Sequence, residues 1–147
     1  MSLATMHEWA LAEAVCTSAM NAAQQEHLDT IIEIVINIGE LQQINKNLFQ
    51  EIMQDMIPET YPILKKAKIT VHIETTTLHC RHCNHEWTFT SVKDNLTGDE
   101  AEAIHFVPEV AFVHMRCPKC QHPDFEIIKG RGVSIQSITG EKADGSP

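Results

Sequence analysis

The alternation of apolar and polar residues predicts a helix followed by a strand at the start of the chain. Residues 9–27 carry small and apolar side chains at helical spacing, which predicts one amphipathic helix. Its apolar positions are Leu11, Val15, Ala19 and Ala22. The next segment alternates residue by residue up to Gly39, which is the period of a strand with one apolar face. The isoleucines of that face are Ile32, Ile34, Ile36 and Ile38.

A second amphipathic helix is predicted over residues 45–57. Asn45 or Asn47 is suited to cap its start, and Pro58 stops it. Its apolar stripe consists of Leu48, Phe49, Ile52, Met53, Met56 and Ile57. These methionines fill a core in this interpretation and do not form a metal-binding set.

Two later segments complete a sheet. Residues 68–76 alternate as a half-exposed strand, and residues 125–138 predict a third strand in which Gly130 and Gly132 mark a bulge or bend. We therefore expect an α+β fold, with two helices on one face of a three-stranded sheet. The expected domains are residues 1–77 plus 125–147, and an inserted subdomain over residues 78–124.

The insertion contains two C-x-x-C pairs, Cys80 with Cys83 and Cys117 with Cys120. Two thiolates at this spacing can face one cation, and two such pairs complete a tetrahedron that selects zinc, or less often iron. The insertion has little apolar core, so the metal is expected to supply much of its folding free energy. The sequence therefore predicts a zinc-ribbon-like subdomain with a structural site.

Other uses of the cysteines fit the sequence pattern less well. Cys16 lies beside the apolar stripe of the first helix and is expected to be a buried core thiol. A redox C-x-x-C would stand at a helix start within a βαβ frame, which the pattern lacks. Histidines can replace or supplement a thiolate, but four cysteines already close the shell. The neighbouring histidines are His79, His82 and His85.

Composition narrows the class of partner. Twenty acidic residues against eleven basic ones give a formal charge of −9, which disfavours a nucleic acid. No apolar run reaches membrane-spanning length, and "MSLAT" lacks the features of a secretory signal, so we expect a cytoplasmic protein with no membrane partner. Nine histidines and five cysteines direct attention to metals.

Enzyme signatures are incomplete. "HEWAL" at 7–11 and "HEWTF" at 85–89 begin like the zinc-protease motif H-E-x-x-H, but both lack the second histidine. "HIE" at 72–74 resembles half of a deaminase motif on a strand, and "RCPKC" does not supply the other half. No phosphate loop or nucleophile elbow is present. We expect a protein that is not an enzyme.

The N-terminal "MHE" admits two interpretations. One is a solvated chain end, with Glu8 near the positive end of a helix. The other requires the chain to begin at Met6. The Met6 amine, the His7 amide and imidazole, and the Glu8 amide then form a small chelate of nitrogens suited to square-planar Ni(II) or Cu(II).

Several segments together resemble the HypA family of nickel-incorporation proteins. They are "MHEWALAEAV", "INIGEL", the two C-x-x-C pairs, "IHFVPEV" and "KGRGVSI". The similarity runs from Met6 to Ile138, and the long insertion with "IHFVPE" looks archaeal. The family matures [NiFe]-hydrogenases and, in some bacteria, urease. Family members begin at the methionine of "MHE", whereas "MSLAT" precedes it here, which makes the Met6 nitrogen an amide.

The resemblance implies a nickel domain and a zinc domain. His7 matches the essential nickel histidine, with the Met6 nitrogen and Glu8 as neighbouring ligands, and His105 resembles a further nickel ligand of archaeal relatives. It also implies transfer of Ni(II) from a HypB-type nucleotidase to a hydrogenase large-subunit precursor. A zinc-ribbon protein-interaction adaptor without a nickel role is the alternative. The sequence leaves open the client and the choice between a monomer and a homodimer.

Overall fold

The computed structural model describes residues 3–42, 44–92, 95–100, 103 and 115–143. The chain divides into two compact units. The first unit comprises Met1–Asn37, Ile44–His72 and Val133–Pro147. The second unit comprises Ile38–Gln43 and Ile73–Gly132. None of the helices in the described ranges has the length and apolar character needed to cross a membrane.

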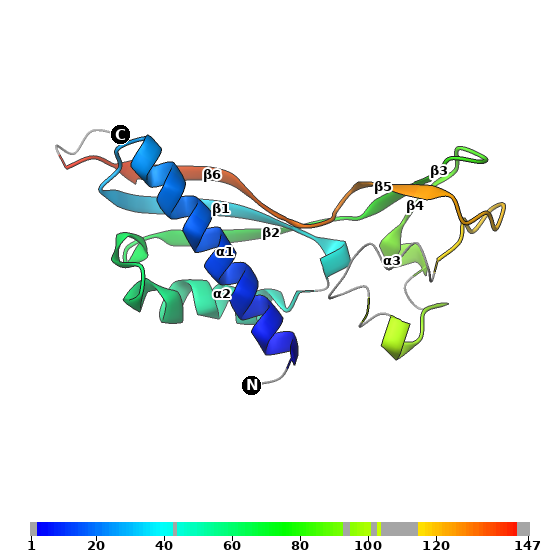
Figure 1. The fold of residues 1–147 in the computed structure, drawn as a ribbon, viewed down its shortest axis with the longest axis horizontal. Coiled ribbons are helices and arrows are strands. Elements are labelled where there is room, and N and C mark those ends of the chain that lie inside the picture. Colours follow the sequence, from blue (N-terminus) through cyan, green and yellow to red (C-terminus); the bar gives the residue numbers. More distant parts are fainter. Residues whose placement is uncertain (1–2, 43, 93–94, 101–102, 104–114, 144–147) are drawn as a thin grey trace. The chain divides into compact units, whose positions relative to one another are not determined.

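The first unit is built on a three-stranded sheet in the order β2-β1-β6. Its strands are β1 (Thr30–Gly39), β2 (Lys68–Glu74) and β6 (Val133–Glu141). The helix α1 (Leu3–Gln25) contacts both β6 and the helix α2 (Lys46–Glu51), as Figure 1 shows. The predicted α+β class is confirmed.

One face of α1 is buried from Glu8 to Ala23. Its fully or almost fully buried residues recur every three or four positions, which keeps them on one face of a helix. They are Glu8, Ala12, Val15, Cys16, Ala19 and Ala23. Cys16 is a core thiol as predicted, with its Sγ 3.8 Å from the Met53 Sδ. Burial, and then the charge of Glu13, raises the pKa of Cys16 to about 12.

The second helical segment is less regular than the sequence predicts. Asn45 caps α2, since its side chain accepts a hydrogen bond from the Leu48 N–H at 3.0 Å. After Glu51 the chain continues as a π-helical turn (Ile52–Met56) and a 3₁₀ turn (Ile57–Glu59). Because the wider π turn rotates the later residues around the axis, the predicted stripe is broken. Met56 is 48% exposed.

The strand β1 keeps the predicted alternation only in its second half. Ile34, Ile36 and Ile38 are fully buried, as expected for one apolar face. Ile32 was expected on the same face but is 37% exposed, and Ile31 is buried in its place. The buried face therefore shifts by one residue between Ile32 and Ile34, a change that the run of apolar residues conceals.

The prediction of one strand over residues 125–138 was wrong. The segment forms β5 (Phe125–Lys129) in the second unit and β6 in the first. β5 pairs antiparallel with β3 (Thr77–Cys80), which also pairs with β4 (Glu86–Thr88), so the second sheet has the order β4-β3-β5. Gly130 and Gly132 adopt positive φ angles of 88° and 74°, a conformation that interrupts a strand.

Thr76 links three segments of the second unit through hydrogen bonds. Its side-chain Oγ1 donates to the Gly130 carbonyl at 2.6 Å and accepts from the Leu41 N–H at 3.0 Å. Its own carbonyl accepts from the Phe89 N–H at the start of the helix α3 (Phe89–Val92) at 3.1 Å. Thr76 is fully buried, so these bonds are shielded from water.

Candidate metal centres

The first cysteine pair lies on a tight turn at the end of β3. The Cys80 N–H donates to the His85 carbonyl at 2.8 Å, and the Asn84 N–H donates to the Cys80 carbonyl at 2.9 Å. Asn84 adopts a left-handed conformation with φ of 62°, which asparagine tolerates well. The Cys83 N–H points to the Cys80 Sγ at 3.4 Å. The turn thus directs both thiols to one side.

The second pair repeats this turn. The Cys117 N–H donates to the His122 carbonyl at 3.1 Å, and the Gln121 N–H donates to the Cys117 carbonyl at 2.8 Å. Gln121 has a φ of 63°, although a longer side chain is less suited to that conformation. The two turns therefore present their cysteines in equivalent ways.

The four thiols form one cluster. The Cys80 and Cys120 Sγ atoms are 3.6 Å apart, the Cys83 and Cys117 Sγ atoms are 3.7 Å apart, and all four lie within 4.8 Å of one another. Zn–S bonds of about 2.3 Å in a tetrahedron require sulfur atoms about 3.8 Å apart. The donor set and its spacing therefore fit zinc. Cys80 and Cys117 are buried, and the other two are half-buried.

The local hydrogen bonds distinguish the thiols. Burial raises the pKa of Cys117, but hydrogen bonds from the backbone of Cys120 and Lys119 and from neighbouring thiols lower it to about 7. A backbone hydrogen bond from His122 lowers the pKa of Cys120, but burial and hydrogen bonds with the other three thiols raise it to about 12. The thiols thus differ in how readily each gives up its proton. A divalent cation removes this difference, because it binds all four groups as thiolates.

The histidines beside the cluster make other contacts. The His79 Nδ1 lies 2.9 Å from the Glu126 Oε1, and the His82 ring stacks on His122 with centroids 4.4 Å apart. The His122 Nδ1 accepts from the Asp124 N–H at 3.1 Å. Among the described residues, the metal-ligand group consists of the four cysteines without a histidine. Zinc ligation by these four remains a prediction that the geometry supports.

The N-terminal motif lies within α1. Met6, His7 and Glu8 all follow the first residue of the helix, Leu3. Glu8 is only 1% exposed, so it does not lie at a solvated chain end, which corrects that interpretation. Its Oε1 accepts a hydrogen bond from the Asn45 N–H at 3.1 Å. His105, the further candidate ligand, lies outside the described residues.

Sequence reasoning missed the burial of Glu8, although a signal was present. Glu8 precedes Ala12 by four residues and Cys16 by eight, which places it on the buried face of the helix. An acidic residue at such a position indicates a specific partner. The partner, Asn45, is 37 residues away in the sequence, and no local pattern identifies it.

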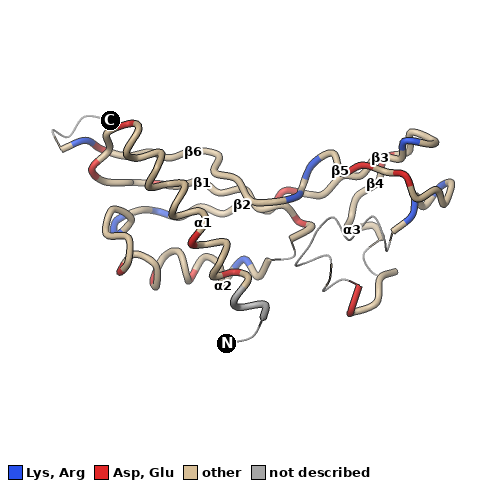
Figure 2. Tube along the Cα trace, in the orientation of Figure 1, with Lys and Arg blue, Asp and Glu red and all other residues tan. Residues whose placement is uncertain are grey.

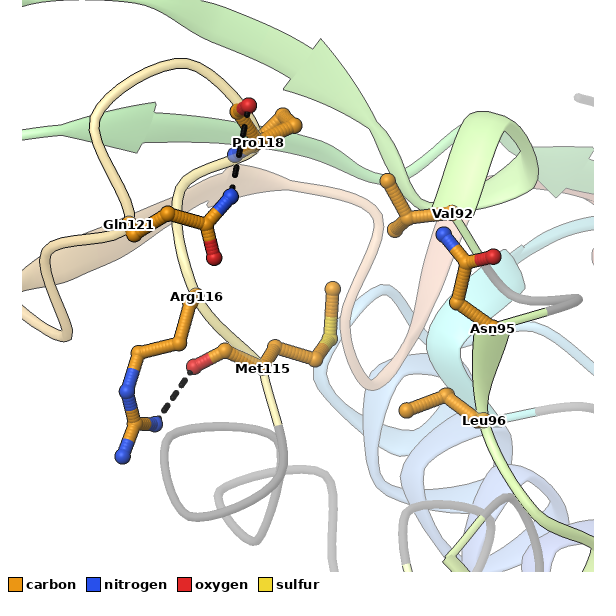
Figure 3. Close-up of a pocket in the computed structure, with 7 residues that line it drawn as sticks. All are labelled: Val92, Asn95, Leu96, Met115, Arg116, Pro118 and Gln121. Atoms are coloured by element: carbon orange, nitrogen blue, oxygen red, sulfur yellow. Dashed lines mark hydrogen bonds between the residues drawn. The ribbon is translucent and has the colours of Figure 1, made fainter.

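A pocket of about 420 Å³ lies in the second unit (Figure 3). Its described lining consists of Val92, Asn95, Leu96, Met115, Arg116, Pro118 and Gln121. The Gln121 side-chain amide donates to the Pro118 carbonyl at 3.5 Å. These lining residues include no cysteine, histidine or carboxylate, so they add no ligand to the thiol cluster. Figure 2 shows acidic residues on both units of the chain.

The fold and the thiol cluster define a small metal-binding α+β protein. Comparison with known proteins identifies the family within this class. The family described as "Hydrogenase/urease nickel incorporation, metallochaperone, hypA" matches residues 6–140. The chain belongs to the HypA family.

Individual relatives agree with this assignment. The hydrogenase maturation factor HypA of Pyrococcus abyssi is 41% identical over 140 residues, which cover 95% of this chain and 99% of the relative. The protein of the same name from Thermococcus kodakarensis is 38% identical over 96% of this chain and its own full length. The solution structure of the Ni metallochaperone HypA from Helicobacter pylori has a TM-score of 0.59 at 18% identity. It covers 92% of this chain and 97% of its own, and shows a shared fold.

Proposed function

We propose that this protein is a cytoplasmic nickel metallochaperone and not an enzyme. It binds Ni(II) as cargo at its N-terminal Met-His-Glu motif and delivers it for the maturation of [NiFe]-hydrogenase. The observation that carries the proposal is the family match over residues 6–140, which includes both the motif and the cysteine pairs. The proposed partners are a HypB-type nucleotidase, which supplies the nickel, and a hydrogenase large-subunit precursor, which receives it.

The proposed nickel ligands are nitrogen atoms. They are the Met6 nitrogen, the His7 amide and imidazole, and the Glu8 amide, with His105 as a further candidate. Nitrogen donors in one plane suit Ni(II), whereas soft thiolates in a tetrahedron suit zinc. This difference in donor type supports separate sites for cargo and structural metal.

Zinc at Cys80, Cys83, Cys117 and Cys120 is proposed as a purely structural ion. The sulfur spacing supports a closed four-thiolate shell. Such a shell leaves no open coordination position for a substrate. Its contribution is to hold the two turns of the second unit together.

The start of α1 bears on nickel affinity. In a helix that begins at Leu3, the His7 N–H is directed to the Leu3 carbonyl, so this nitrogen binds nickel only if the first turn opens. A chain that begins at Met6 has a free amine and no such competing carbonyl. We therefore expect tighter nickel binding by that chain than by the chain of 147 residues.

Calorimetric titration with Ni(II) tests the proposal. We expect about one site of micromolar or tighter affinity in the chain that begins at Met6, equivalent to about −8 kcal/mol or better. His7→Ala should abolish that site, and the matched variant His72→Ala, at an exposed position on β2, should retain it. Equal nickel affinity in His7→Ala and the parent protein would overturn the proposal.

A further inference from the structure

Glu8 has an unusual position for a charged residue. It is 1% exposed and shares the buried face of α1 with Ala12 and Cys16. A carboxylate at a core position costs free energy unless its oxygens accept hydrogen bonds. Its Oε1 accepts from the Asn45 N–H at 3.1 Å. The Glu8 Oε2 is also buried and has no hydrogen-bond partner among the described residues.

The bond to Asn45 completes the N-terminal cap of α2. In a capping box, the N-cap side chain accepts from the N–H of the third helical residue, whose carboxylate accepts from the N-cap N–H in return. Asn45 makes the first bond, to the Leu48 N–H, but the leucine side chain cannot make the second. Glu8 supplies the missing carboxylate from another helix. The same bond therefore pins α1 to α2 one residue after His7.

We infer that Glu8 is a positioning residue for nickel binding. Its carboxylate acts through the Asn45 N–H and does not coordinate the metal. This inference rests on the nickel site of the proposed function. Helix ends fray, and the proposed nitrogen ligands of Met6, His7 and Glu8 lie near the start of α1. A frayed segment must be ordered before it can present several nitrogens to one ion, and that ordering lowers the affinity. In the chain that begins at Met6, the bond between Glu8 and Asn45 orders this segment before nickel arrives.

Two substitutions at Glu8 separate positioning from ligation by the side chain. Glu8→Gln retains an oxygen that accepts from the Asn45 N–H, but its amide is a poor metal ligand. Nickel affinity should then stay within about twofold of the parent protein, whereas Glu8→Ala should lower it about tenfold. The visible absorption spectrum of bound Ni(II) should be unchanged in Glu8→Gln. Equal loss of affinity in both variants, with a changed spectrum, would assign the carboxylate to the metal and overturn the inference.

A second substitution separates positioning from general stability. In Glu8→Ala, the added change Leu48→Glu supplies a carboxylate to the Asn45 N–H from within α2, as in an ordinary capping box. It should restore α2 but not the link to α1, so thermal stability should recover while nickel affinity stays low. Recovery of both would show that Glu8 only stabilises the fold. The control Gln54→Ala, which removes a bond to the Ala67 carbonyl, should lower stability without changing nickel affinity.

Hydrogen exchange in the metal-free protein keeps this test distinct from the test of nickel binding. Glu8→Ala should speed amide exchange in the first turns of α1, and Glu8→Gln should not. If the parent protein binds no nickel through His7, the proposed function fails, yet the exchange data still report whether Glu8 pins the helix. Unchanged exchange in Glu8→Ala would overturn the inference even if nickel binds.

Discussion

The Sγ atoms of Cys83 and Cys117 lie 3.7 Å apart, although the two cysteines are 34 positions apart in the sequence. The two turns that carry them have the same hydrogen-bond pattern and the same left-handed residue after the second cysteine. The two turns thus meet at one end of the second unit, where their four thiols lie together. The remaining buried residues around this end include Leu78, Trp87 and Phe125.

Removal of one thiol should release the zinc and disorder the second unit. Cys117→Ser replaces a soft ligand by a hydroxyl, so we expect less than about 0.2 zinc ions per chain, against about one in the parent protein. Elemental analysis measures the zinc content, and the fluorescence of Trp87, which packs in the same core, reports the loss of order. Cys16→Ala is the matched control at the fifth cysteine and should keep its zinc. Full zinc occupancy in Cys117→Ser would contradict the four-thiolate site.

Cys16 should resist alkylation until the protein unfolds. Its folded pKa of about 12 exceeds the ordinary thiol value of 9.0, because burial disfavours the thiolate. The neutral thiol therefore stabilises the fold fully below pH 9, and this stabilisation is lost as the pH rises from about 9 towards 12. Mass spectrometry after iodoacetamide treatment of the zinc-loaded protein at pH 8 should find Cys16 unmodified. Rapid modification without unfolding would show that the thiol is accessible.

The hydroxyl of Thr76 should stabilise the second unit. Thr76→Val keeps the shape of the side chain but removes the donor to Gly130 and the acceptor for Leu41. We expect a loss of about 1–3 kcal/mol in the free energy of unfolding, since a buried backbone carbonyl loses its side-chain donor. Chemical denaturation monitored through Trp87 measures it. Thr76→Ser keeps the hydroxyl, so a loss as large as that of Thr76→Val would point to packing instead.

Gly39 should not tolerate a side chain. A Cβ atom at this position would lie 2.2 Å from the Gly130 carbonyl oxygen, so the two backbones would have to separate. The Gly39 N–H also donates to the Gly132 carbonyl at 2.8 Å, a bond that such a movement would weaken. Gly39→Ala should cost about 1–3 kcal/mol of stability or more. Gly98→Ala is the control, since a Cβ there meets no atom within 4 Å, and equal melting temperatures for both variants would refute the prediction.

The sequence predicts the local features of this fold well. Cysteine pairing within each turn depends on a spacing of three residues, and the side-chain cap of α2 is a bond between Asn45 and the Leu48 N–H three residues later. Helical periodicity placed Cys16 in the core, as observed. Each of these features is decided by residues within about one turn of each other.

Features that depend on distant pairing were missed. The alternation in residues 125–138 is the same whether they form one strand or two, so it could not show that β5 joins β3 and β4 in a second sheet. The exposure of Ile32 and Met56 follows from a shifted strand face and a π-helical turn, which hydrophobicity does not encode. The bond from Asn45 to Glu8 is a tertiary contact and needed the structure.

X-ray absorption at the nickel edge, on zinc-loaded protein that begins at Met6 and carries one equivalent of Ni(II), tests the central claim most directly. If nickel is bound by nitrogen atoms near His7, its spectrum should show nitrogen and oxygen scatterers and no sulfur. If sulfur atoms bind only zinc, the protein should keep its zinc. His7→Gln should lose this spectrum. Nickel–sulfur scattering accompanied by release of zinc would place nickel at the cysteines and contradict the account.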